Sequence, residues 1–102
     1  MNALFSFNTK TFLVDDKITV NHTNFFFSWG LSVSLAKKHF TKVILVTDNK
    51  GKELLCDILK LPFDEVMLNF NTLPNVNKNL FLYPKIYAMD LQTEPFVYIE
   101  PD

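Results

Sequence analysis

The chain has 102 residues, which is the size of one domain. Hydrophobic residues make up 48% of it and charged residues 21%, values of a globular protein that exclude intrinsic disorder. The chain has ten lysines, no arginine and eleven acidic residues, for a net charge of −1. A dedicated nucleic-acid-binding protein is therefore not expected.

Cysteine content and hydropathy exclude further classes. The single cysteine, Cys56, rules out an internal disulfide framework and a multi-cysteine zinc site, and its place in an apolar helix predicts a small core residue rather than a reactive thiol. No apolar run reaches the roughly 18 residues of a membrane span, and no secretory signal begins the chain. We therefore expect a cytoplasmic protein with no membrane span.

The amino-terminal part predicts a strand, a long connection and a helix. Ala3–Phe7 is a short apolar strand. The polar residues 8–24 follow, and the segments FLV and KITV on either side of Asp15 and Asp16 predict a minor hairpin. Phe25–Phe40 then has the periodicity of a helix that ends in two lysines and a histidine, as the helix dipole favours.

This helix is apolar on two sides. One arc of about 100° suits packing on a sheet, and its members are Phe25, Phe26, Trp29, Val33, Ala36 and Phe40. Phe27, Leu31 and Leu35 form a second stripe, so more chain or another subunit should cover it. Gly30 is expected to allow close helix packing. A homo-oligomer is therefore one expected partner state.

The rest of the chain alternates strands and helices. The expected strands are Val43–Val46, Glu65–Leu68 and Phe96–Ile99, the first and last of them buried on both faces. The expected helices are Lys50–Lys60 and Leu80–Gln92, the latter with a possible true start at Pro84, and the Asn-rich residues Asn69–Asn79 form a loop.

Such alternation predicts one α/β domain over residues 1–102. The expected fold is a Rossmann-like three-layer sandwich, with a mainly parallel sheet in strand order 3-2-1-4 and helices on both faces. Ligands of these sheets bind beyond the carboxyl ends of the strands, at the switch point beside the first strand. The residues expected there are Asn8, Thr9, Thr47, Asp48, Glu100 and Asp102.

Three candidates each have two interpretations. Asp48 either accepts hydrogen bonds from a ribose or base, or caps the following helix, or does both. Glu100 and Asp102 have the spacing of two carboxylates on one divalent cation, but such a triplet at a terminus also suits a solvated tail. Lys85 either reaches a phosphate or is a surface lysine.

Several segments together resemble a known group of proteins. ALFSFNTK, FFFSWGLSVSLAKKHF, KVILVTDNKGKELL, LKLPFDEV and KIYAMDLQTEPFVYIEPD cover nearly the whole chain. They are similar to an uncharacterised bacterial family that looks like the nucleotide-diphospho-sugar transferases of the GT-A type. The resemblance rests on VTD-x-x-G, LPFDEV and K-I-Y-A-x-x-L-Q-x-E-P-F as a set, each of which is weak alone.

The resemblance implies a function for particular residues. Glu100 and Asp102 stand where GT-A enzymes hold Mn²⁺ or Mg²⁺ against the sugar-nucleotide diphosphate, although a glutamate replaces the first aspartate. It further implies Asp48 for the nucleoside, the turn of Phe7, Asn8 and Thr9 for base and ribose, and Lys85 at the position of the family's lysine.

The resemblance also implies an incomplete, truncated GT-A fold. The chain would be the nucleotide-sugar-binding half of a glycosyltransferase, inactive without an acceptor-binding half. Two other interpretations stay open. One is a non-catalytic α/β module that oligomerises, or binds a protein partner, through its apolar first helix and open sheet edge. The other is a phosphoacceptor-like domain built around Asp48, which lacks the acidic pair after its first strand.

Overall fold

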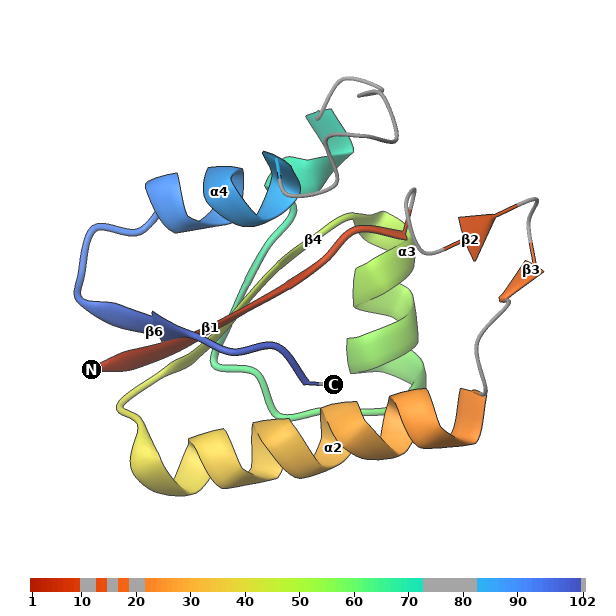
Figure 1. Ribbon diagram of the computed structural model, residues 1–102, viewed down its shortest axis with the longest axis horizontal. Helices are drawn as coiled ribbons and strands as arrows, with labels where there is room; N and C mark the ends of the chain where they lie inside the picture. Colours follow the sequence, from red (N-terminus) through yellow and green to blue (C-terminus); the bar gives the residue numbers. More distant parts are fainter. Residues whose placement is uncertain (10–12, 15–16, 19–21, 73–82, 102) are drawn as a thin grey trace.

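Four parallel strands form the centre of the computed structural model (Figure 1). They are β1 (Asn2–Phe7), β4 (Val43–Thr47), β5 (Glu65–Met67) and β6 (Phe96–Tyr98). Their order in space is β5-β4-β1-β6, and each neighbouring pair is parallel. The predicted order 3-2-1-4 and the Rossmann-like α/β fold class are therefore confirmed.

The structure describes residues 1–9, 13–14, 17–18, 22–72 and 83–101. Its helical segments are α2 (His22–His39), α3 (Asn49–Lys52), η1 (Glu53–Ile58), η2 (Asn69–Thr72) and α4 (Tyr83–Asp90). The predicted minor hairpin is confirmed as the antiparallel pair β2 (Leu13–Val14) and β3 (Lys17–Ile18). Within the described helices, none has the length and apolar character needed to cross a membrane.

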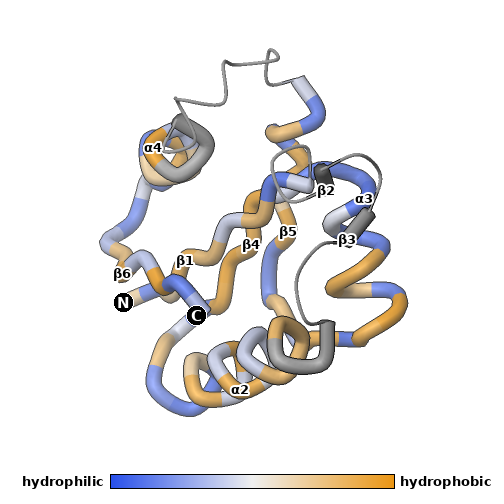
Figure 2. Tube along the Cα trace, turned by 45° about the vertical axis from the view of Figure 1, so that its right-hand side comes forward, coloured by the Kyte–Doolittle hydropathy of each residue, from blue (hydrophilic) through white to orange (hydrophobic). Residues whose placement is uncertain are grey.

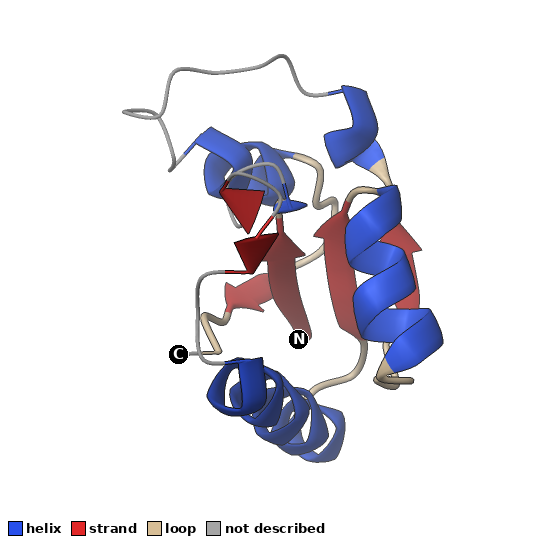
Figure 3. Cartoon of the chain, turned by 90° about the vertical axis from the view of Figure 1, so that its right-hand side faces the viewer, coloured by secondary structure: helices blue, strands red, loops and turns tan. Residues whose placement is uncertain are grey.

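The helices cover both faces of the sheet and so make three layers (Figure 3). Successive residues of a strand point to opposite faces, and β1 accordingly sends Phe5 to the face of α2 and η1 but Leu4 to the face of α4. Figure 2 shows hydrophobic residues along β1 and β4, between α2 and α4. These two inner strands are apolar on both faces because both faces are covered.

The two predicted sides of α2 have different surroundings. Trp29, Val33 and Ala36 are almost fully buried against the sheet, which confirms the predicted inner arc. The second predicted stripe is exposed, with 70% of Phe27, 51% of Leu31 and 47% of Leu35 accessible to solvent. The sequence predicted that more chain or another subunit would cover this stripe. No residue in the described part of the chain does so.

One expectation about the later elements is wrong. The apolar run of β6 predicted a strand buried on both faces, but Val97 is 40% exposed at the edge position that the predicted strand order gave to this strand. The predicted helix Lys50–Lys60 is confirmed as a helical segment, in which the short α-helix α3 continues into the π-helix η1. Residues 80–82, where the last helix was expected to begin, lie outside the described residues, and α4 is described from Tyr83.

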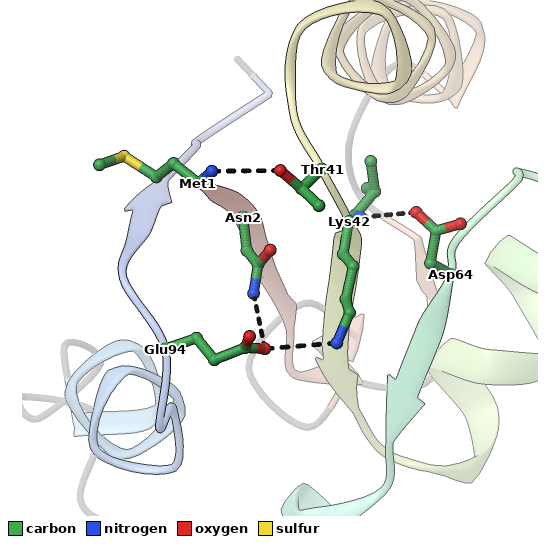
Figure 4. A network of polar contacts seen from close by, with 7 residues as sticks. Met1, Asn2, Thr41, Lys42, Asp64 and Glu94 are labelled. Carbon is green, nitrogen blue, oxygen red and sulfur yellow. Dashed lines mark hydrogen bonds and ion pairs between the residues drawn. The ribbon is translucent and has the colours of Figure 1, made fainter.

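Polar contacts join the amino ends of the strands (Figure 4). Glu94, just before β6, accepts 3.3 Å hydrogen bonds from the Asn2 amide of β1 and the Lys42 ammonium before β4. Asp64, just before β5, accepts a 2.7 Å hydrogen bond from the backbone N–H of Val43. The bond from Lys42, and then that from Asn2, hold the pKa of Glu94 below its ordinary value. Polar and charged groups thus pair with one another at the amino edge of the sheet.

Candidate functional site at the carboxyl edge of the sheet

Asp48 accepts three hydrogen bonds at the carboxyl edge of the sheet. It directly follows β4 and is 5% exposed, as is Thr9 after β1. Its Oδ2 accepts hydrogen bonds from the Thr9 backbone N–H at 3.1 Å and from the Thr9 hydroxyl at 2.7 Å. Its Oδ1 accepts the backbone N–H of Gly51 at 2.8 Å. Asp48 is therefore a helix N-cap that also fixes the turn after β1.

The close contact of α3 with the sheet brings the capping N–H group to Asp48. The Thr47 hydroxyl donates a 2.7 Å hydrogen bond to the Phe7 carbonyl, which joins the last residues of β4 and β1. A Cβ atom on Gly51 would overlap the Thr47 hydroxyl and lie 3.1 Å from the Phe7 ring. Only a glycine lets α3 begin so close to the sheet, and this closeness brings its N–H groups to Asp48.

A pair of exposed amides extends the edge toward β5. Asn71 of η2 accepts a hydrogen bond from the Asn49 backbone N–H at 2.8 Å, and its own amide donates to the Asn49 side-chain oxygen at 3.1 Å. Sequence reasoning missed this pair because it interpreted the Asn-rich segment only as a loop. The one available signal was the position of Asn49 directly after the strand-ending Asp48.

A second missed contact lies at the seam between β1 and β6. The hydroxyl groups of Ser6 and Tyr98 are 2.6 Å apart and share a hydrogen bond across the two strands. Both side chains are half-buried on the sheet face that α4 covers. The signal in the sequence was a serine inside an otherwise apolar strand.

The remaining predicted residues are less well defined. Glu100 is exposed and follows β6 by two residues. β6 pairs with β1 only as far as Leu4, three residues before the end of β1, so the strand pairing does not place Glu100 beside Asn8 and Asp48. Asp102 lies outside the described residues. Lys85 lies in the first turn of α4, and its side chain lies outside the described part of the structure.

The described residues do not form a metal site. No group of three or more His, Cys, Asp or Glu side chains in this part of the chain is placed to hold a metal ion. Both carboxylate oxygens of Asp48 already accept protein hydrogen bonds, which leaves Glu100 as one exposed carboxylate. One monodentate or bidentate ligand does not fix a divalent cation. The predicted metal pair of Glu100 and Asp102 therefore stays a prediction.

Cys56 has the surroundings of a packing residue. It is half-buried in η1 and packs against the core on the α2 side of the sheet. Burial raises the pKa of its thiol, and the neighbouring Asp57 carboxylate raises it further, against a smaller opposite effect of Lys52. A raised pKa leaves less thiolate at neutral pH, so Cys56 is expected to be a weak nucleophile.

Comparison with known proteins adds a family. No curated protein and no solved structure matches the chain. A family model does match, over residues 1–102, and its description reads Family of unknown function (DUF6734). That description names neither sugar transfer nor a bacterial source, so the GT-A-type activity stays a prediction. Because the match covers the whole sequence, the chain belongs to the family of unknown function DUF6734.

Proposed function

We propose that this chain binds a nucleotide-diphospho-sugar at the carboxyl edge of its sheet, as the nucleotide-binding half of a glycosyltransferase-like protein. One observation supports the proposal: Thr9 and Asp48 follow the adjacent parallel strands β1 and β4 and bind each other at the carboxyl edge of the sheet. Asn8 lies between β1 and Thr9, and Glu100 follows β6 on the other side of β1. In open α/β sheets that edge, at the switch in strand order beside the first strand, is where ligands bind.

Thr9 and Asp48 act in this proposal as positioning residues. Each is 5% exposed, and they bind each other through two hydrogen bonds. Their role is to hold the Phe7–Thr9 turn rigid beside the end of β4, so that the turn presents a preformed surface to a base or ribose. A binding surface that is fixed before the ligand arrives loses less conformational entropy on binding.

The exposed groups of the edge suit a polar, uncharged part of a ligand. Asn49 and Asn71 carry amides that both donate and accept hydrogen bonds, which is the chemistry that recognises sugar hydroxyls and base edges. The diphosphate is assigned to the side of the edge where α4 begins. The described residues supply no complete donor set for a metal ion, so a divalent cation, which Glu100 and Asp102 would hold, is proposed only as an aid to binding of the diphosphate.

An NMR titration of the full chain with UDP, GDP and a UDP-sugar, with and without Mg²⁺, tests the proposal. We expect millimolar or tighter binding, with shifts at Asn8, Thr9, Asn49, Asn71 and Glu100. Glu100→Gln should remove any dependence on Mg²⁺. The matched control Glu94→Gln, a glutamate at the amino edge, should leave it unchanged.

Two results would contradict the proposal. One is the absence of shifts with every nucleotide at 10 mM. The other is a set of shifts confined to the amino edge, around Lys42 and Glu94, which would indicate nonspecific attraction of phosphate to a lysine. Asn71→Ala then separates the base or sugar contact from the phosphate contact, because it should weaken binding of the UDP-sugar more than binding of inorganic diphosphate.

A further inference from the structure

We propose that Ser6 and Tyr98 are positioning residues, whose hydroxyl groups fix the end of β6, and with it Glu100, beside the end of β1. The two hydroxyl oxygens are 2.6 Å apart and share a hydrogen bond. Glu100 follows Tyr98 by two residues in the chain. The consequence for a ligand rests on the proposed function, whereas the placement of β6 stands on the contacts between the two strands.

Backbone pairing alone holds the end of β6 weakly. β4 pairs with β1 as far as Phe7, the last residue of β1, but β6 pairs with β1 only as far as Leu4. The N–H of Ile99, directly after β6, adds a 2.9 Å hydrogen bond to the Leu4 carbonyl. In the four-stranded sheet β6 lies at an edge and has β1 as its one neighbour. A single further bond to β1 therefore has a large share in holding this strand.

The hydroxyl pair extends the contact beyond the backbone pairing. Tyr98 is the register partner of Leu4, but its hydroxyl meets Ser6, two residues nearer to the carboxyl end of β1. Such a diagonal contact on one face of a sheet is within reach of an aromatic side chain. The ring of Tyr98 thus joins β6 to a part of β1 that the backbone of β6 does not pair with.

Packing alone does not account for a serine at this place in β1. The buried residues of the sheet face that α4 covers are apolar, namely Leu4, Ile44, Val46, Phe70 and Ala88. Ser6 is the one half-buried residue of β1, whose other residues are buried. A valine or leucine would remove more apolar surface from water. A hydroxyl on an apolar face needs a hydrogen-bond partner, and the Tyr98 hydroxyl is that partner for Ser6.

A fixed Tyr98 limits where Glu100 can lie. If the parallel register of β6 and β1 continued by two residues, Glu100 would be opposite Ser6, but the pairing ends at Tyr98. Two residues span at most about 7 Å of extended chain. The hydroxyl pair therefore keeps Glu100 near the end of β1, on the side away from β4.

Amide hydrogen exchange of the full chain tests this placement without any ligand. The Ile99 N–H bonds to Leu4 at the carboxyl end of the β1–β6 seam, and the Asn2 N–H bonds to the Pro95 carbonyl at its amino end. Tyr98→Phe removes one hydroxyl of the pair and should lower the protection of the Ile99 amide about two- to tenfold. The protection of the Asn2 amide should change less, because the pair lies at the other end of the seam.

Variants of Ser6 supply the matched controls. Ser6→Ala removes the other hydroxyl and should reproduce the loss at Ile99, while Ser6→Thr keeps the hydroxyl and should retain the protection. The double variant Ser6→Ala, Tyr98→Phe should lose no more than either single variant, since one hydrogen bond is lost in all three. Unchanged protection of Ile99 in Tyr98→Phe overturns the inference, and so does an equal loss at Ile99 and Asn2, which would indicate a general effect on stability.

An NMR titration with UDP and Mg²⁺ then tests the consequence for the site. Tyr98→Phe should reduce the shift at Glu100 and leave the shift at Thr9, which Asp48 holds. A Glu100 shift of full size in Tyr98→Phe overturns the positioning role. Absence of UDP binding in every variant contradicts the proposed function instead, and the exchange of Ile99 still decides whether the hydroxyl pair places β6.

Discussion

Thr9 and Asp48 are 39 residues apart in sequence, and two hydrogen bonds join them through one carboxylate oxygen. Thr9→Val keeps the shape of the side chain but removes the hydroxyl donor, and leaves a buried carboxylate with one partner fewer. We expect the free energy of unfolding to fall by about 1–2 kcal/mol. Urea denaturation measures this loss, and Thr9→Ser, which keeps the hydroxyl, should recover most of it. Equal stability of the valine variant and the original chain would show that the bond contributes nothing net.

The close packing of Gly51 on Thr47 predicts a large effect from a single methyl group. Gly51→Ala forces that methyl into the Thr47 hydroxyl and the Phe7 ring, and should lower stability by about 1–3 kcal/mol. The matched substitution Gly30→Ala meets no described atom and should be neutral or stabilising by up to about 1 kcal/mol in dilute solution. Thermal unfolding of the two variants side by side checks the contrast, and equal effects would contradict it.

Lys60 has a left-handed backbone conformation, with φ at 56°, two residues after η1 ends. The conformation lets the Leu61 N–H return to the Leu55 carbonyl at 3.0 Å. Glycine adopts this conformation without a steric penalty, so Lys60→Gly should raise the free energy of unfolding by about 0.5–1 kcal/mol. Lys60→Ala is the control, because it removes the same charge and keeps the strain. A stabilised alanine variant would attribute the gain to charge.

Asp64 gives the fold a dependence on pH. The hydrogen bond from Lys37, and then that from the Val43 N–H, hold the pKa of this carboxyl below its ordinary value of 3.8. The unfolded chain therefore binds the proton more readily, and the stabilisation is complete well above pH 3.8 and lost as the pH falls through the lowered pKa.

Asp64→Asn tests this dependence by flattening the loss of stability between about pH 5 and pH 2. The side chain is 35% exposed, so solvent screening limits the difference to less than about 1 kcal/mol. Unfolding midpoints against pH measure it, with Glu53→Gln on η1 as the control. A slope that stays the same in Asp64→Asn would assign the acid sensitivity to other carboxylates.

The sequence predicted those features that local patterns determine. The apolar runs of β1 and β4, the alternation of elements and the hairpin around Asp15 and Asp16 follow from side-chain chemistry at short range. The strand order was predicted from the rule that connections between parallel strands of one sheet are right-handed crossovers. The position of Asp48 at the end of a strand and the start of a helix predicted an N-cap among other roles, and the cap is what the structure shows.

Features that depend on neighbours distant in the chain were not predictable in the same way. The run FVYI, which contains β6, has the composition of a strand buried on both faces, but composition does not record how much of an edge strand stays exposed, as Val97 does. The adjacent apolar residues Leu54 and Leu55 are compatible with both α-helical and π-helical spacing, so the sequence does not indicate that η1 is a π-helix. The pairing of Asn49 with Asn71 needs the ends of two strands to be adjacent first.

The central place of β1 also determines an order of assembly. Its neighbour β4 follows about forty residues later, since Ala3 pairs with Val43, and β6 follows more than ninety residues later, since Asn2 pairs with Phe96. Long loops close slowly, so β1 and β4 should associate first and β6 should dock onto a sheet that already exists. Amide hydrogens of β6 should then exchange faster than those of β1 and β4. β1 is the first of the four sheet strands to be synthesised. Both of its edges are paired only after β6, the last of the four, has been made.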